Sequence, residues 1–409
     1  MTYGIGSFSL MKNMNMAIVL EKIQQTNGIS RAQIAKDTGL TPATVTNLVS
    51  ELLKDGVIKE FKTGVSNGGR RPIILKMNPG KYAIASVYIS PDKIEFMLSN
   101  LLAEEIYYSY IDYGKANDIN ECIDFIVSHY ISAKNSFKRK IIGVSIGMHG
   151  IVDTNSGVSV FAPNLGWHNI ELKKILKQRI DAPVFIDNDV RLMTLAEVWF
   201  GKAKNVSDMV YLYIGKGIGS TIIAGKEVYS GSSSAAGEIG HFSIDANGPL
   251  CSCGNRGCLQ SFANITAIEQ YINDAISNTN ITTCLTENST LDELISAHKS
   301  GDEASRLVFE KEASYLAIAI GNIINMINPE MIVIDSAVND LSEIIIPYIE
   351  KQLPNRSMKY QRDACSIKYS ALGKKAVLKG GAALVLKQVY RQPDIIKDAK
   401  HQRRDFNEQ

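Results

Sequence analysis

Two successive blocks of the sequence repeat one alternation of strand and helix patterns, and this repetition limits the folds open to the chain. A helical pattern over residues 120–136 lies inside the first block, and a long helical pattern precedes Met331 in the second. The strand patterns occupy residues 82–89, 93–102, 141–147, 209–231 and 331–337. Such alternation is typical of α/β folds. Two copies predict two α/β lobes with a cleft between them, the usual place for a small-molecule site.

The N-terminal segment follows a different pattern, three short helices in succession. Residues 16–28 carry apolar residues at helical spacing and end on an Asn-Gly stop. Ser30 predicts the cap of a second helix, which turns at Gly39. Thr41 as a cap and Pro42 at the first helical position predict a third helix that ends near residue 56. A glycine turn before the third helix is typical of a helix-turn-helix.

The hairpin pattern and the charge of this segment favour DNA as its partner. Residues 57–78 alternate like two strands around a glycine-rich tip, which predicts the wing of a winged helix. Residues 1–80 hold ten Lys or Arg against five Asp or Glu, whereas the rest of the chain holds 34 against 37. The alternative is a protein-interaction domain whose charge is a solvated face.

The third helix of a helix-turn-helix lies in the major groove, where small polar side chains reach base edges and phosphates. Arg70 and Arg71 could reach an adjacent A·T-rich minor groove, which attracts guanidinium groups. The groove-facing residues of the third helix are predicted to be Ala43, Thr44, Thr46 and Asn47.

Length and composition set the remaining bounds. The 409 residues suit two or three domains, and 45% hydrophobic with 21% charged residues is typical of a soluble globular protein. No apolar run reaches the ~18 residues of a membrane span, and the first residues lack a secretory signal pattern, so we expect no membrane partner and a cytoplasmic location. In that reducing compartment, clustered thiols indicate metal rather than disulfides.

The order of motifs resembles the repressor branch of the ROK family, which groups sugar-responsive repressors with sugar kinases. The motifs are GVSIGMHGIVD, FAPNLGW, FIDNDVRLMTLAE, YIGKGIGSTII, AGEIGH, CSCGNRGC and NPEMIVID, after the helix-turn-helix. The resemblance covers nearly the whole chain. It implies a winged helix-turn-helix at residues 1–79, a first actin-like or sugar-kinase-like lobe at 80–200, and a second lobe at 201–375. The C-terminal helix near 376–391 is expected to pack on the first lobe.

One imidazole and three thiols fall within eighteen residues, His241, Cys251, Cys253 and Cys258. This set is typical of a closed, tetrahedral, structural zinc site, and the resemblance implies the same four ligands. The alternative is three buried thiols and a core histidine that hold no metal. With four protein ligands no position remains for a reactive water, so we expect a structural ion.

The resemblance also implies sugar-binding residues. Glu238 and His241 of the GEIGH motif face sugar hydroxyls in the family, and Asn188-Asp189 bind the sugar, where the aspartate is the general base of the kinases and faces the hydroxymethyl oxygen of a hexose. From the residues alone, Asn188 and Asp189 could equally be helix caps and Glu238 a surface carboxylate. Less specific sugar-site candidates are Gly150, Asn164 and Gln260, the last standing where the family usually has a glutamate.

Two departures from the kinase pattern argue against phosphoryl transfer. Tyr88 and Ser90 occupy the positions of the Asp-x-Gly phosphate loop, and Asp335-Ser336 replace a glycine pair where nucleotide would rest. Only the GKGIG turn remains as a phosphate-binding candidate, so we expect no catalytic residues and no enzyme.

The sequence thus predicts a transcriptional repressor of carbohydrate uptake or catabolism genes, released from its operator by a monosaccharide. A single DNA-binding domain per chain predicts a homodimer or homotetramer on a near-palindromic operator. Xylose is favoured slightly over glucose or N-acetylglucosamine, because Gln260 replaces a glutamate associated with hexose contacts. The alternatives are an active ATP-dependent sugar kinase with an appended DNA-binding domain and a repressor controlled mainly by a protein partner.

Overall fold

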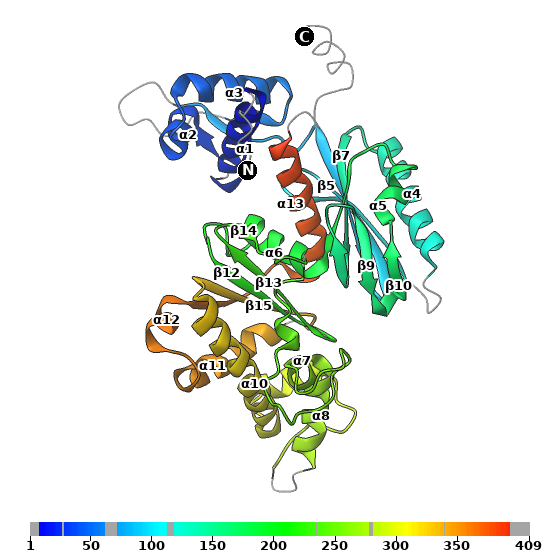
Figure 1. The fold of residues 1–409 in the computed structure, drawn as a ribbon, viewed down its shortest axis with the longest axis vertical. Coiled ribbons are helices and arrows are strands. Elements are labelled where there is room, and N and C mark those ends of the chain that lie inside the picture. The colour runs from blue at the N-terminus through cyan, green and yellow to red at the C-terminus, as the bar shows by residue number, and fades with distance from the viewer. Residues whose placement is uncertain are drawn as a thin grey trace. The chain divides into compact units, whose positions relative to one another are not determined.

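The computed structural model describes residues 8–26, 28–61, 72–112, 118–233, 235–277, 281–338 and 340–392. Two compact units divide the chain, one made of residues 1–195 with 377–409 and the other of residues 196–376. The chain therefore passes from the first unit to the second inside helix α6 (Asp189–Phe200) and returns at the start of helix α13 (Ala376–Arg391). Both elements are labelled in Figure 1.

The N-terminal part of the first unit has three helices and a small sheet of order β1-β3-β2. Its elements are α1 (Phe8–Thr26), β1 (Ile29–Ser30), α2 (Arg31–Thr38), α3 (Pro42–Lys54), β2 (Ile58–Phe61) and β3 (Ile74–Met77). Local signals set the helix boundaries, because Ser30 accepts a hydrogen bond from the Gln33 amide and Thr41 accepts one from the Thr44 amide. Gly39 takes the left-handed conformation that ends α2. The first helix begins at Phe8, eight residues earlier than predicted.

The rest of the first unit is built on a five-stranded sheet of order β11-β7-β4-β5-β6. The three strands β11, β7 and β4 are parallel, and β5 and β6 continue the sheet antiparallel. The strands are β4 (Tyr82–Ile89), β5 (Lys93–Ser99), β6 (Glu105–Asp112), β7 (Lys140–Met148) and β11 (Val184–Asn188). Helices α4 (Ile119–Ser136) and α5 (Leu172–Lys177) contribute apolar side chains to the core on one face of this sheet.

Two further features of the first unit position its candidate residues. A small antiparallel sheet, β8 (Ile151–Asp153), β9 (Val158–Ala162) and β10 (Trp167–Ile170), follows β7 and was not predicted. Helix α13 lies close against the large sheet, since a Cβ on Gly381 would lie 2.2 Å from the Ser145 hydroxyl and one on Gly380 would lie 1.8 Å from the Leu192 carbonyl oxygen. The glycine pair is therefore required for this close approach.

The second unit holds a second five-stranded sheet, of order β14-β13-β12-β15-β16. The strands are β12 (Met209–Ile214), β13 (Ile218–Ala224), β14 (Glu227–Val228), β15 (Met331–Ser336) and β16 (Ser366–Tyr369). The helices are α7 (Gln260–Ala263), α8 (Ile265–Ile276), α9 (Leu291–Lys299), α10 (Glu303–Ile327), α11 (Leu341–Gln352) and α12 (Lys359–Ala364). Alternate side chains of β12 and β15 pack with α8, α10 and α11 into one apolar core.

None of the described helices is both long enough and apolar enough to cross a membrane.

Candidate functional site

The imidazole and the three thiols predicted to bind metal converge in the second unit. His241 ends a short 3-10 turn (Ile239–His241), and the cysteines lie on the loop that follows it. Their four ligand atoms all lie within 4.8 Å of one another. His241 Nδ1 is 3.8 Å from Cys251 Sγ, and the Sγ atoms of Cys253 and Cys258 are 3.7 Å apart. Zinc–sulfur bonds of ~2.3 Å make a tetrahedron with edges of about 3.8 Å, so the cluster has the dimensions of a zinc site.

Two glycines allow the loop to close around these atoms. Gly254 and Gly257 have φ angles of +91° and +68°, the left-handed region that other residues rarely adopt. A Cβ on Gly257 would lie 1.6 Å from the Asp245 carbonyl oxygen. The backbone of the loop is tied by hydrogen bonds from Cys251 N to Asn255 O at 2.7 Å and from Gly254 N to Cys251 O at 2.9 Å.

The thiols do not share one environment. Burial raises the pKa of Cys258 to about 12, and its hydrogen bonds to the other two thiols act in the same direction. Burial also opposes ionisation of Cys251, but hydrogen bonds from the Cys253 amide and from Gln260 outweigh it and lower the pKa to about 6. Three thiolates side by side need a cation between them, which is the chemistry of this donor set.

Gln260 lies against this cluster. Its Nε2 donates to Cys251 Sγ at 3.1 Å and lies 3.4 Å from the Ser252 hydroxyl. The amide of Gln260 is therefore a donor to the sulfur of Cys251, a contact that a carboxylate could not make.

Glu238 begins the 3-10 turn that ends at His241. Its side chain is exposed and makes no capping hydrogen bond. Gly240, between the two residues, packs so closely on β13 that a Cβ would lie 2.1 Å from the Ile218 carbonyl oxygen. The backbone between Glu238 and His241 is therefore held by β13.

A second group of candidates lies in the first unit, where β11 ends and α6 begins. Asn188 Oδ1 accepts hydrogen bonds from the amides of Val190 and Arg191 at 2.9 and 3.2 Å, and its Nδ2 donates to the Gly150 carbonyl at 3.0 Å. Asn188 is thus both the cap of α6 and a tie to Gly150. Gly150 has a φ of +100°, and a Cβ there would lie 2.2 Å from the Phe161 carbonyl oxygen.

Asp189 is the buried member of this group, with 5% of its surface exposed. Its Oδ1 accepts from the Val190 amide at 2.9 Å, and Tyr88 Oη donates to its Oδ2 at 3.3 Å. Burial raises the pKa of the carboxyl, and the nearby His149 opposes this shift. Asn164 is exposed and lies in the 3-10 turn Pro163–Leu165 between β9 and β10.

At the positions where the sequence departs from the kinase pattern, the side chains make hydrogen bonds within the fold. Ser90 closes the turn between β4 and β5, donating to the Lys93 carbonyl at 2.8 Å and accepting from its amide at 3.0 Å. Tyr211 Oη donates to Asp335 Oδ2, and burial raises the pKa of this carboxyl. The backbone of the GKGIG turn is tied to α8, since the Ile265 amide donates to the Gly215 carbonyl at 3.0 Å.

Most of the α3 residues predicted to face the DNA groove are exposed to solvent. Ala43, Thr46 and Asn47 are exposed, whereas Thr44 is half-buried with its hydroxyl 2.9 Å from that of Thr41. Arg70 and Arg71 lie outside the described residues.

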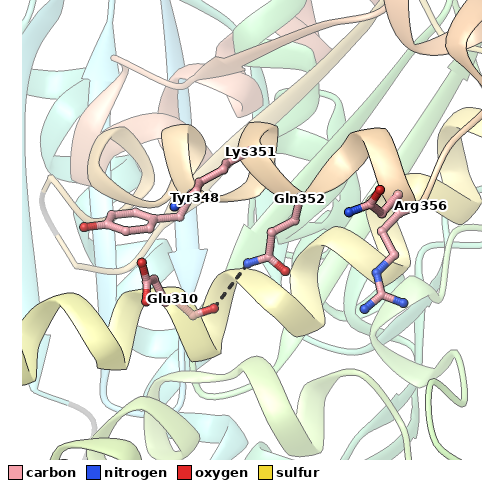
Figure 2. Close-up of a pocket in the computed structure, with 6 residues that line it drawn as sticks. Glu310, Tyr348, Lys351, Gln352 and Arg356 are labelled. Atoms are coloured by element: carbon pink, nitrogen blue, oxygen red, sulfur yellow. Dashed lines mark hydrogen bonds between the residues drawn. The ribbon is translucent and has the colours of Figure 1, made fainter.

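Two cavities of the second unit lie apart from all of these predicted residues. One, of about 360 Å³, lies between α10 and α11, where Gln352 Nε2 donates to the Glu310 carbonyl at 3.3 Å (Figure 2). The other, of about 460 Å³, lies at the start of α9. Neither is lined by a residue predicted to bind sugar or metal.

Comparison with known proteins places this geometry in a family. The sequence matches the ROK family over residues 84–388 and a winged helix-turn-helix DNA-binding domain over residues 19–59. The chain belongs to the ROK family. Its predicted fold class, a winged helix-turn-helix followed by a two-lobed α/β ROK domain, is confirmed.

Two repressors of the ROK family match the chain over nearly their whole length. The chain is 32% identical to a xylose repressor of Caldicellulosiruptor bescii, over 95% of this chain and 100% of the relative. It is 29% identical to the N-acetylglucosamine repressor of Escherichia coli O157:H7, over 93% of this chain and 94% of the relative. These comparisons confirm the predicted class, a sugar-responsive DNA-binding repressor.

Solved structures separate regulators from kinases within the ROK fold. A ROK family transcriptional regulator, a homolog of the E. coli MLC protein, superimposes with a TM-score of 0.81 at 26% identity, covering 95% of this chain and 100% of that one. A ROK family glucokinase of Streptomyces griseus superimposes with a TM-score of 0.64 at 24% identity, covering 74% of this chain and 98% of that one. The second likeness shows the shared fold.

Sequence reasoning missed two contacts that this ROK chain makes at its candidate residues. Tyr88 was treated only as a lost kinase residue, although it bonds to Asp189, and Gln260 was treated only as a sugar contact, although it bonds to Cys251. Alternation along β4 could have shown that Tyr88 lies on the face opposite its buried neighbours, but not which residue it meets.

Proposed function

We propose that this ROK protein represses carbohydrate genes by binding an operator through its N-terminal domain and leaves the operator when a monosaccharide binds. The observation that carries the proposal is that a capped helix-turn-helix, with Ala43, Thr46 and Asn47 exposed on α3, precedes a ROK domain matched over residues 84–388. The regulator structure covers 95% of the chain, which includes this N-terminal part. The kinase structures cover only about three quarters of the chain.

The DNA-binding domain is taken as residues 1–79 and the lobes as residues 80–200 and 201–375, with residues 376–391 belonging to the first lobe. In this proposal α3 enters the major groove, where Ala43, Thr44, Thr46 and Asn47 contact bases and phosphates. Arg70 and Arg71 reach the adjacent minor groove. Two DNA-binding domains of a homodimer or homotetramer occupy the two half-sites of the operator.

His241, Cys251, Cys253 and Cys258 hold one structural zinc ion in this proposal. The ligand spacing supports it, since two of the separations, 3.8 and 3.7 Å, are close to the edges of a zinc tetrahedron and all four atoms lie within 4.8 Å of one another. When bound, zinc supplies charge to hold three thiolates together. His241 turns Nδ1 toward the thiols, so its Nε2 stays available for another group.

The inducer is a neutral monosaccharide, with xylose preferred, and its contacts come from Asn188, Asp189, Glu238 and His241. Asp189 supplies a buried acceptor, and Glu238 an exposed one on the turn that carries His241. Asn188 has one amide hydrogen left after its contacts to the backbone. Supporting roles are assigned to Gly150 through its backbone, to Asn164, and to Gln260 through Cys251. The names of the xylose repressor relatives support xylose.

The chain does not phosphorylate sugar in this proposal. Tyr88 and Ser90 stand where the resemblance puts the phosphate loop of the kinases, and Asp335 supplies a half-buried carboxyl where it puts the nucleotide. Sugar binding instead shifts the population between two arrangements that differ in operator affinity.

The test is binding of the purified protein to the DNA upstream of its own reading frame, with and without xylose, glucose and N-acetylglucosamine. We expect tight binding without sugar and release by one of them. Operator binding that is unchanged by all three sugars would favour control by a protein partner. ATP hydrolysis that depends on sugar, measured in a coupled assay, would favour the kinase alternative.

A further inference from the structure

We propose that Tyr88 selects the inducer by size, admitting an aldose that lacks an exocyclic hydroxymethyl group and excluding one that carries it. The inference rests on the proposed function, because it takes Asp189 as a sugar-binding carboxylate. It adds a specificity-determining residue and a substrate class, the pentopyranoses.

The position of Tyr88 follows from the register of the first sheet. Its neighbours Val87 and Ile89 point into the apolar core of the first unit, so alternation turns Tyr88 to the opposite face. Its parallel partner on β7 is Gly147, and the strand paired to the other side of β7 is β11, which ends at Asn188. Two strands that flank β7 therefore bring Tyr88 to the residue that follows β11, although the two are 101 residues apart in sequence.

The hydrogen bonds of Asp189 occupy one acceptor site on each of its oxygens. One carboxylate oxygen accepts from the Val190 amide, and the other accepts from the Tyr88 phenol. Each oxygen can accept two hydrogen bonds, so each can still accept one further donor. The phenol oxygen, at 3.3 Å, already stands where a second hydroxyl would bind.

This arrangement favours a smaller sugar for a steric reason. A hexopyranose differs from xylose by one carbon and one oxygen beyond the ring, and that hydroxymethyl group needs both space and a hydrogen-bond acceptor. In this inference the Tyr88 ring occupies the space beside Asp189 that the hydroxymethyl group would need, and its hydroxyl uses one acceptor site of the carboxylate. Tyrosine is held at both ends, by its strand and by the carboxylate, so moving it aside breaks a hydrogen bond to a buried charged group.

The sharpest variants are Tyr88→Ala, which opens the space, and Tyr88→Phe, which keeps the ring but removes the hydroxyl. The matched control is Tyr108→Phe, because Tyr108 also donates from β6 to a buried carboxylate, Glu95. Affinities for xylose and glucose are measured by calorimetry on the full-length protein, with operator binding as the check that each variant folds.

We expect the native protein to prefer xylose over glucose by tenfold or more, since glucose could enter only if Tyr88 moved and gave up its hydrogen bond to the buried Asp189. Tyr88→Ala should reduce that preference at least tenfold, mainly through tighter glucose binding. Tyr88→Phe should keep glucose excluded, and Tyr108→Phe should change neither affinity. An unchanged preference in Tyr88→Ala would overturn the inference.

A second measurement needs no variant and so remains decisive if Tyr88→Ala does not fold. The native protein is titrated with 6-deoxyglucose, which carries a methyl group in place of the hydroxymethyl group. Rejection of this sugar along with glucose supports exclusion by size, and binding of either as tightly as xylose refutes it. If the native protein binds operator but none of these sugars, the proposed sugar response fails, an outcome distinct from loss of selectivity alone.

Discussion

The two groups of candidate residues are held in place by different means. In the second unit, the loop with Cys251, Cys253 and Cys258 has left-handed glycines and closely spaced thiols that only a cation can bring into one charged cluster. In the first unit, Asn188 and Gly150 are fixed by backbone hydrogen bonds and close packing. The comparison teaches that the candidates of the second unit have the donor set of an ion-dependent cluster, whereas those of the first unit are organised by the polypeptide alone.

The largest effect is expected from Cys253→Ser, which removes one thiolate of the ion-dependent loop. We expect zinc content to fall from one ion per chain to well below one, with a loss of stability of about 3 kcal/mol or more, because metal binding contributes directly to folding. Elemental analysis and thermal unfolding measure the two effects. Cys284→Ser is the matched control, since Cys284 is exposed and lies outside the cluster. Native protein that holds no zinc when purified without chelator would contradict the prediction.

The backbone-held group should be most sensitive at Gly150. Gly150→Ala places a Cβ 2.2 Å from the Phe161 carbonyl oxygen at a φ of +100°, and we expect destabilisation of about 3 kcal/mol with zinc content unchanged. Gly166→Ala is the control, because Gly166 also has a positive φ of 68° but no atom within 4 Å of a Cβ. It should cost only about 1 kcal/mol in denaturant unfolding. Equal costs for the two variants would show that close packing does not hold Gly150.

The pH dependence of the first unit offers a smaller effect at Asp187. Burial raises the pKa of this carboxyl to about 6, although Arg191 lies 3.7 Å away and acts against the shift. The folded state then binds more protons than the unfolded state between pH 4 and 6, so the stability contributed by Asp187 falls as pH rises through this window. We expect a change on the order of 2 kcal/mol. Asp187→Asn should remove it, and unfolding at several pH values compares the two proteins; parallel curves would refute the assignment.

The smallest effect is expected from Asn188→Ala, which removes the cap of α6. The loss should be about 1 kcal/mol, the usual cost of an N-cap deletion. Asn188→Asp keeps the capping oxygen but loses the donor to Gly150, so it should recover the cap contribution without the tie between β7 and α6. If Asn188→Ala lowered zinc content as well, the two groups would not be held independently.

Local signals in the sequence were sufficient for some elements and not for others. The start of α3 was predicted because Thr41 and Pro42 act within one turn of helix, and the metal cluster because its three thiols fall within eight consecutive residues. The β8–β10 sheet was missed, since its strands have only three to five residues and expose part of each face. The bond between Tyr88 and Asp189 was missed because it arises from strand order, which no local pattern encodes.

The return of the chain to its first unit at residue 377 has a consequence for synthesis. The N-terminal helices and hairpin are contiguous in residues 8–77, so they can fold soon after they leave the ribosome. The first large sheet must wait for Gly380 and Gly381 of α13, which are made about 190 residues after β11 and then cover Ser145 and Leu192. During translation the DNA-binding domain is therefore complete before the sensor domain that controls it. A messenger RNA truncated before the codon for residue 377 yields a DNA-binding domain attached to an incomplete sensor domain.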